Sequence, residues 1–205
     1  GRLYNAGQVC CASKRFLVHN SIKQEYIDKL ISKINTLKVG YPSEEDTDIG
    51  CLISEEAAIL VESQVSKTIS QGARLVYGGR RNGAFYEPTI LDGITRDMDV
   101  SGDMEIFGPV ISIIGFETIE EAVEIANQSK FGLSGSIITR DMNKAIKVSE
   151  MMECGGFVIN GSSFFRSFEQ PFGGWKYSGI GNEGIMTTLK EMSRMKTVIL
   201  KNIGE

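Results

Sequence analysis

The sequence predicts an α/β fold, an open and mostly parallel sheet covered by helices. Short apolar, β-branched runs alternate along the chain with segments whose apolar residues recur at helical spacing. The run 110–116 is apolar almost throughout, as expected of a strand buried on both faces. The segment 21–37 places its apolar side chains on one helical face. Because strands that alternate with helices are joined by right-handed crossovers, we expect helices over the faces of a parallel sheet.

The first half of the chain alternates in this way from its start. The elements predicted there are strands at 15–19, 75–77 and 89–91 and helices at 21–37 and 55–71. Ser21 and Gln24 have the spacing of a capping box at the start of the first helix. Ser54 precedes the second helix as its cap, and Gly72 is its C-terminal stop.

The second half continues the alternation. The elements predicted there are strands at 110–116, 135–139 and 156–159 and helices at 118–128 and 141–152. Thr118 and Glu121 form a cap for the first of these helices. The apolar segment 196–201 predicts a last strand, with no later element of the chain to pair with it.

Composition excludes several classes of protein. With 205 residues, 41% hydrophobic and 23% charged, the chain has the composition of an ordinary globular domain. A formal charge of -4 indicates no nucleic-acid partner, and the absence of a long apolar run indicates no membrane span. With one histidine, no metal-site pattern can be formed. The four cysteines, two of which are adjacent, do not have the regular spacing of a disulfide framework. Reduced thiols and a cytoplasmic location are expected.

A possible nucleophile lies near the start, in Gly7-Gln8-Val9-Cys10-Cys11-Ala12. The thiolate of Cys10 could attack a carbonyl carbon, because sulfur is intrinsically nucleophilic. A free thiol titrates at about pH 8.5, so a working nucleophile needs positive potential or aligned N–H groups around it. The structural alternative is that Cys10 and Cys11 are two small buried hydrophobic residues.

Three stretches together resemble the NAD(P)-dependent aldehyde dehydrogenases, in the order of that family. They are Tyr4–Ala12, which resembles the cysteine signature, Glu105–Val110, and Pro171–Gly179. The resemblance covers the family's C-terminal portion and implies a catalytic domain at 1–190 with an oligomerisation tail at 191–205. The nucleotide-binding half of such an enzyme would lie upstream of Gly1.

The resemblance also implies roles for individual residues. Cys10 would be the catalytic nucleophile, and its backbone N–H would help to hold the oxyanion. Glu105 would bind the nicotinamide ribose of NAD or NADP, and Phe107 would lie beside the nicotinamide. The general base, a glutamate in a Glu-Leu-Gly-Gly motif, and an oxyanion asparagine would lie upstream and are absent from this sequence.

Among the branches of the family, the sequence is most similar to the succinate-semialdehyde dehydrogenases. The resemblance implies that Phe172 and Cys11 contact the substrate, a small aldehyde. Arg166 is either a surface charge or the partner of a substrate carboxylate. Many members carry an arginine six residues before the cysteine; Tyr4 stands there in this sequence, and Arg2 is nearby but out of phase.

The C-terminal strand at 196–201 would join a sheet with a neighbouring subunit, which implies a homodimer or homotetramer.

Two other classes of function remain open. One is a thiol hydrolase or acyltransferase, whose base could only be His19, about 25 Å from Cys10 in an extended chain. The other is a truncated oligomerisation module without catalysis. Residues 179–184 match G-x-G-x-x-G, but no strand precedes them, so a dinucleotide-binding loop is not expected there.

Overall fold

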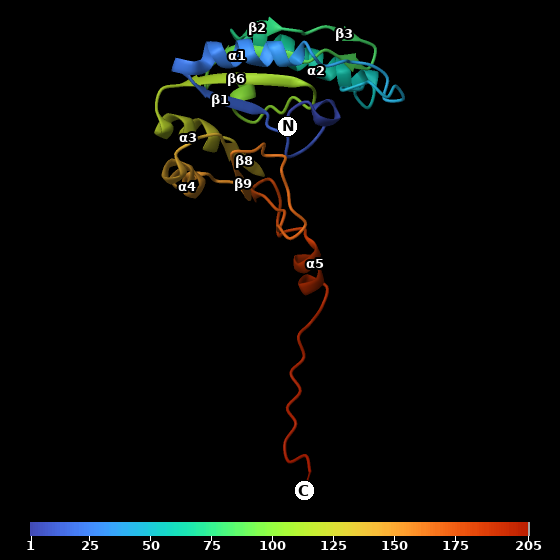
Figure 1. Cartoon of the computed structure of the whole chain (residues 1–205), viewed down its shortest axis with the longest axis vertical. Helices are drawn as coiled ribbons and strands as arrows, with labels where there is room; N and C mark the ends of the chain where they lie inside the picture. The colour runs from blue at the N-terminus through green and yellow to red at the C-terminus, as the bar shows by residue number, and fades with distance from the viewer. Residues whose placement is uncertain (205) are drawn as a thin grey trace.

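The computed structural model describes residues 1–204, and within them four strands form a central sheet in the order β1-β6-β5-β2 (Figure 1). These strands are β1 (Arg15–His19), β2 (Arg74–Tyr77), β5 (Thr89–Ile94) and β6 (Val110–Phe116). β6 pairs in parallel with both β1 and β5, whereas β2 lies antiparallel at the edge. The predicted α/β fold with a mostly parallel sheet is therefore confirmed.

Helices cover both faces of this sheet because the side chains of β6 alternate between two cores. One face packs against α1 (Asn20–Ile34), and its core includes Ile27, Ile34, Ile111 and Ile113. The other face packs against α2 (Glu55–Ser70) and α3 (Ile119–Asn127), and its core includes Val61, Val65, Val110, Ile114 and Ile125. Each such fully buried aliphatic side chain contributes about 1.5–3 kcal/mol.

A second group of elements lies beyond α3 (Figure 1). It contains the parallel pair β8 (Ser134–Ile137) and β9 (Gly156–Ile159), with α4 (Met142–Met151) between them in sequence. The sequence predicted a single sheet. Within residues 1–204, β8 and β9 instead form a sheet of their own, because β8 does not pair with β1. A cleft of about 1210 Å³ is lined by both strands.

The remaining elements are short. They are η1 (Tyr4–Gly7), the hairpin strands β3 (Arg81–Asn82) and β4 (Phe85–Tyr86), η2 (Asp99–Ser101), β7 (Phe131–Gly132), β10 (Trp175–Lys176) and α5 (Ile185–Glu191). β10 pairs antiparallel with β7, which attaches the glycine-rich loop to the body of the chain. In residues 1–204, no helix has both the length and the apolar character that crossing a bilayer requires.

One predicted helix cap is wrong. β1 runs directly into α1, so the helix begins at Asn20 and His19 takes the cap position. The His19 Nδ1 accepts a hydrogen bond from the Ser21 N–H at 3.2 Å. Ser21 therefore lies inside the first turn, and Gln24 donates to Asp28 instead of completing a capping box. The predicted caps Ser54 and Thr118 do accept hydrogen bonds at the starts of α2 and α3.

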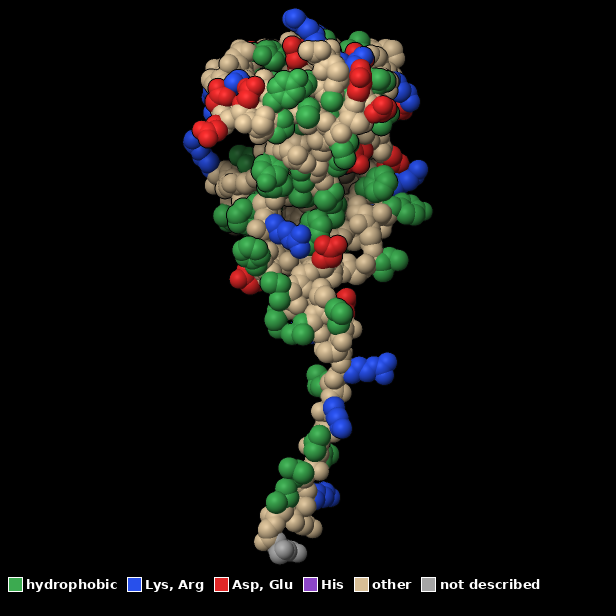
Figure 2. Space-filling model, turned by 90° about the vertical axis from the view of Figure 1, so that its right-hand side faces the viewer, with side chains coloured by type: hydrophobic (Ala, Val, Ile, Leu, Met, Phe, Trp, Pro, Cys, Tyr) green, Lys and Arg blue, Asp and Glu red, His purple; other side chains and the backbone are tan. Residues whose placement is uncertain are grey.

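The C-terminal strand, predicted to pair with a neighbouring subunit, is not formed within the single chain. Residues 193–204 contain no strand, and they lead away from the body of the chain after α5 (Figure 1). A strand requires a partner for its N–H and C=O groups, and no described segment offers one. The tail carries exposed apolar side chains (Figure 2), of which Val198, Ile199 and Leu200 are 67%, 77% and 73% exposed.

Candidate active site

The segment before Cys10 has an unusual backbone. Asn5, Ala6 and Gly7 have φ values of 49°, 52° and 80°, all in the left-handed region. Asparagine and glycine tolerate this conformation, whereas alanine is held in it at a cost of about 1–2 kcal/mol. The tightly coiled segment ends at a turn in which the Ala12 N–H donates to the Val9 carbonyl at 3.2 Å. Cys10 lies on this turn with an exposed side chain.

The side chain of Lys14 lies inside this turn. Its ammonium donates to three carbonyl oxygens, those of Val9 (3.1 Å), Cys10 (2.6 Å) and Ala12 (3.2 Å). The same ammonium forms an ion pair with the Glu105 carboxylate, with 2.8 Å between Nζ and Oε1. A single cation thus joins the cysteine turn to a residue 91 positions away, counted as 105 minus 14.

Glu105 and Phe107 face the same way, as their spacing predicted, and both are exposed. The Glu105 side chain is 50% exposed and Phe107 is 41% exposed, whereas Ile106 between them is 3% exposed. This alternation follows from the opposite directions of successive side chains in extended backbone. The Phe107 ring centroid lies 5.8 Å from the Lys14 Nζ, close enough for a cation–π contact.

Arg2 holds this segment from the inside. It is only 4% exposed, and it donates hydrogen bonds to the carbonyl oxygens of Ile106, Gly108 (2.6 Å) and Val110 (2.9 Å). Burial lowers the pKa of Arg2 to about 10, while the charge of Glu105 acts in the opposite direction. Because its guanidinium is buried on backbone carbonyls, Arg2 is not available to bind a substrate carboxylate.

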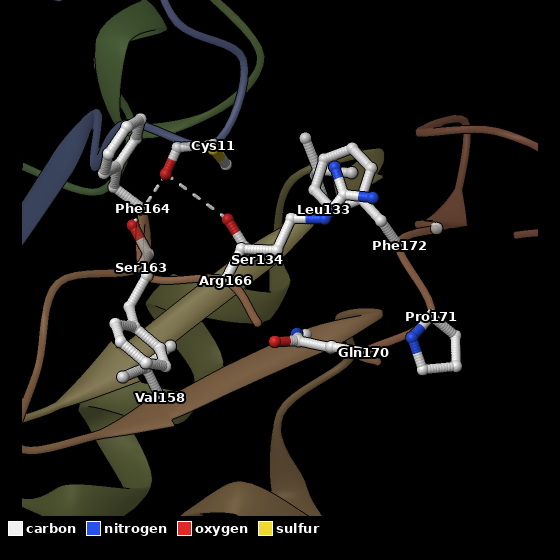
Figure 3. Close-up of a pocket in the computed structure, with 13 residues that line it drawn as sticks. Cys11, Leu133, Ser134, Val158, Ser163, Phe164, Arg166, Gln170, Pro171 and Phe172 are labelled. Atoms are coloured by element: carbon white, nitrogen blue, oxygen red, sulfur yellow. Dashed lines mark hydrogen bonds between the residues drawn. The ribbon is translucent and has the colours of Figure 1, made fainter. Parts of the chain in front are cut away.

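The predicted substrate contacts meet in one pocket (Figure 3). Cys11, Arg166 and Phe172 all line it, although Cys11 is far from Arg166 and Phe172 in the sequence. The guanidinium carbon of Arg166 lies 4.2 Å from the Phe172 ring centroid, which is a cation–π geometry. This stacking holds the exposed Arg166 side chain at the pocket, with N–H groups still available to an anion.

Two serines that the sequence analysis missed support the pocket wall. The Ser163 Oγ donates to the Cys11 carbonyl at 2.8 Å, and the Ser134 Oγ donates to the same oxygen at 3.5 Å. The pocket has a volume of about 10 Å³, which is room for about one water molecule. It is therefore too small, in this arrangement, for an aldehyde of several carbon atoms.

Cys10 faces a different space from Cys11. It lines the cleft of about 1210 Å³ together with Lys14 and Glu105. Burial raises the pKa of Cys11, and the neighbouring Cys10 thiol raises it further. Burial also raises the pKa of Cys154. Of these thiols, only Cys10 combines exposure with a position on the large cleft.

The alternative dyad of Cys10 with His19 is not formed. The two nitrogen atoms of the His19 ring bond to the Ser21 hydroxyl at 2.8 Å and to the Glu117 carbonyl at 3.1 Å.

The glycine-rich stretch 179–184 is preceded by the two-residue strand β10 and a turn, and followed by the seven-residue α5. It therefore lacks the long strand and helix of a dinucleotide-binding unit.

Lys14 is the main residue that the sequence analysis overlooked. A nucleophilic thiol needs positive potential nearby, and Lys14 is the first cation after Cys10 in the sequence. That proximity could have singled it out. Its contact with Glu105 could not be inferred, because it depends on how the two segments pack.

Comparison with known proteins shows the family of this chain. The model of the aldehyde dehydrogenase family matches residues 1–198. The lactaldehyde dehydrogenase of Methanococcus aeolicus is 42% identical over 200 residues, which cover 98% of this chain and 43% of that protein. The chain therefore spans less than half the length of the curated relatives that it matches.

Two solved structures share the fold. One is the glyceraldehyde-3-phosphate dehydrogenase GapN of Methanocaldococcus jannaschii in complex with NADP. It is 44% identical with a TM-score of 0.91, over 97% of this chain and 43% of that one. The other is aldehyde dehydrogenase 21 of Physcomitrella patens in complex with the reaction product succinate. It is 37% identical with a TM-score of 0.92, over 100% of this chain and 42% of that one.

Fold and site together define a class of α/β protein that carries an exposed cysteine on a turn beside a large cleft. The chain belongs to the aldehyde dehydrogenase family.

Proposed function

We propose that this chain is the catalytic portion of an aldehyde dehydrogenase that uses NAD or NADP to oxidise a small aldehyde to its carboxylic acid. The observation that carries the proposal is that Cys10 and Glu105 line one cleft and are joined through Lys14. The nucleophile and the cofactor-binding carboxylate of such an enzyme must face the same space, and no described histidine activates the thiol for a hydrolase mechanism.

The residues present fit a nicotinamide cofactor. Glu105 is half-exposed, and its second carboxylate oxygen has no hydrogen-bond partner within residues 1–204, so it can accept hydrogen bonds from ribose hydroxyls. The exposed Phe107 ring offers an apolar surface beside it. When bound, the cofactor supplies the hydride acceptor that the oxidation needs. A relative solved with NADP supports this fit, but residues that choose between NAD and NADP would lie upstream.

The chain's own residues account for the covalent steps. The Cys10 thiolate attacks the aldehyde carbon, and the C=O electron pair moves onto oxygen to give a thiohemiacetal. The Cys10 N–H donates to that oxygen as its negative charge develops. After oxidation, water adds to the resulting thioester, the carboxylic acid leaves, and the Cys10 thiol is restored. The base that takes the proton from this water is expected from the upstream glutamate.

The substrate is proposed to be succinate semialdehyde, whose carboxylate Arg166 would bind. Arg166 is exposed and stacked on Phe172, so its N–H groups can form a bidentate contact with a carboxylate. The plant relative solved with succinate supports a dicarboxylate-related substrate. The lactaldehyde dehydrogenase relative indicates that a neutral hydroxyaldehyde must be tested as the competing substrate.

The exposed apolar tail supports a homodimer or homotetramer. Val198, Ile199 and Leu200 are consecutive and more than two-thirds exposed in the single chain. A neighbouring subunit that paired with this segment would cover them and satisfy their backbone groups.

The experiment is an activity assay of the full-length enzyme that contains this chain. Purified enzyme is mixed with NAD or NADP and with succinate semialdehyde or lactaldehyde, and the absorbance of the reduced nicotinamide is followed. We expect turnover that a Cys10→Ser substitution abolishes. Hydrolysis of a thioester substrate without any oxidation of aldehydes would instead identify a thiol hydrolase.

A further inference from the structure

The Lys14 side chain contacts both functional segments described above, the turn around Cys10 and the segment that carries Glu105. Its side chain is 23% exposed, so most of it is withdrawn from water. Three acceptors from the cysteine turn and one carboxylate oxygen surround its ammonium. A lysine ammonium has three donor hydrogens, so this environment uses its full capacity.

The carbonyl contacts determine where the turn's N–H groups point. In a trans peptide unit the C=O and N–H bonds point in opposite directions. The Val9 carbonyl and the Cys10 N–H belong to one such unit. Because Lys14 draws the Val9 oxygen toward itself at 3.1 Å, it turns the Cys10 N–H away from the ammonium. Within residues 1–204 this N–H donates no hydrogen bond, so it remains available to a ligand.

The carboxylate contact acts on the other segment. The Lys14 Nζ holds only the Oε1 oxygen of Glu105, at 2.8 Å. The Phe107 ring lies 5.8 Å from the same ammonium. The rotation of the Glu105 side chain is therefore restricted, while its Oε2 oxygen is left for another donor. An isolated exposed glutamate would have to be ordered at the moment of binding, which costs side-chain entropy.

We propose that Lys14 is a positioning residue. It aims the Cys10 N–H at the oxyanion of the reacting aldehyde and holds Glu105 in the orientation that binds the cofactor ribose. This inference rests on the proposed function, because it concerns how the Cys10 turn and Glu105 of the same site are held relative to each other. In this role Lys14 acts through the turn and through the carboxylate.

The test is a set of variants in the full-length enzyme, assayed for kcat and for the KM of the nicotinamide cofactor. Lys14→Met removes the cation and keeps the aliphatic stem. We expect kcat to fall about tenfold or more, because loss of one oxyanion donor outright costs about 10²–10³. We expect the KM of the cofactor to rise by up to about fivefold, the effect of losing a partly exposed ion pair.

Lys23→Met is the matched control. Lys23 is 27% exposed, and it forms one ion pair with Asp92 at 3.1 Å, away from the cysteine turn. It is similar in burial and charge but contacts neither functional segment. Its substitution should lower the melting temperature without changing kcat or KM. Equal kinetics of the Lys14→Met and Lys23→Met enzymes would overturn the proposal.

A double-mutant cycle with Glu105→Gln separates the two roles. In the Glu105→Gln background, Lys14→Met should still lower kcat but should no longer raise the KM of the cofactor. A further KM increase of the same size in that background would show that Lys14 does not act through Glu105.

Lys14→Arg keeps the test decisive if the methionine variant does not fold. A planar guanidinium can still pair with Glu105, but it cannot direct its N–H groups at carbonyls that surround one point. We expect a cofactor KM close to that of the unmodified enzyme together with a reduced kcat. An unchanged kcat of the Lys14→Arg enzyme would show that Lys14 does not orient the Cys10 N–H. If the unmodified enzyme itself shows no aldehyde oxidation, the proposed function fails, which is distinct from any failure of Lys14.

Discussion

Gly7 lies directly against the backbone of Gly108: a Cβ atom built on Gly7 would be 2.1 Å from the Gly108 carbonyl oxygen. Gly7 also has a φ of 80°. The two glycines bring the segment that leads to Cys10 against the segment that carries Glu105. This backbone contact, together with Arg2 and Lys14, fixes the relative position of the two parts of the site.

Gly7→Ala should therefore destabilise the protein. The left-handed backbone alone costs about 1–2 kcal/mol for a residue with a Cβ, and the clash with a carbonyl adds to it. Gly83→Ala is the control, because Gly83 has a φ of 56° and a Cβ there would meet nothing within 4 Å. Melting temperatures of the two variants would be compared, and a decrease no larger for Gly7→Ala than for Gly83→Ala would contradict the close approach.

Cys10 should be the first thiol to react with a limiting amount of iodoacetamide at neutral pH. It is exposed, whereas burial raises the pKa of Cys11 and of Cys154. A raised pKa leaves less thiolate at neutral pH. Labelling of those two thiols should therefore increase only when the pH rises above the pKa of an ordinary thiol. Peptide mapping by mass spectrometry would measure the order, and earlier labelling of Cys11, Cys51 or Cys154 would refute the assignment.

Arg166→Ala should raise the KM for succinate semialdehyde far more than the KM for butanal. A hydrogen bond to a charged group contributes about 1.5–3 kcal/mol, which corresponds to about ten- to a hundredfold. Arg140→Ala, at an exposed position outside the pocket, is the control. The ratio of kcat/KM for the two aldehydes is the measurement, and an equal change for both would leave Arg166 as a surface charge.

Removal of residues from Thr197 onward should reduce the number of subunits in each particle. The deleted segment includes Val198, Ile199 and Leu200, which have no apolar neighbours to cover them in the single chain. Light scattering gives the mass of the full-length and shortened proteins directly. A Lys201→Ala variant, which keeps the apolar segment, should retain the original mass; an unchanged mass after deletion would exclude the tail from the subunit interface.

The isolated 205-residue chain should fold but should not turn over an aldehyde. The two cores on either side of β6 are formed entirely from its own residues. The Glu-Leu-Gly-Gly motif of the expected general base is not in this sequence, and loss of a general base alone costs about 10²–10⁴ in rate. Circular dichroism would report the fold, and the reduced-nicotinamide absorbance would report activity. Steady turnover by the isolated chain would show that a general base outside these 205 residues is unnecessary.

Local periodicity was sufficient to predict most elements of this chain. The strands at 15–19, 110–116 and 156–159 have the predicted bounds, and α2 ends one residue before its predicted end. Period-two and period-3.6 patterns depend only on neighbouring residues, so they can be read without knowing the fold. The sequence also identified the family, because the three motifs kept their order along the chain.

Only the tertiary structure decided which groups meet. The ion pair of Lys14 with Glu105 and the carbonyl contacts of Arg2 join segments about a hundred residues apart, and nothing local specifies such contacts. The cap at His19 arose because β1 continues directly into α1. The predicted strand at 196–201 is not formed in the single chain for the same general reason: an apolar pattern shows that a segment can form a strand, but hydrogen bonds to a partner determine whether it does, and the expected partner is a neighbouring subunit.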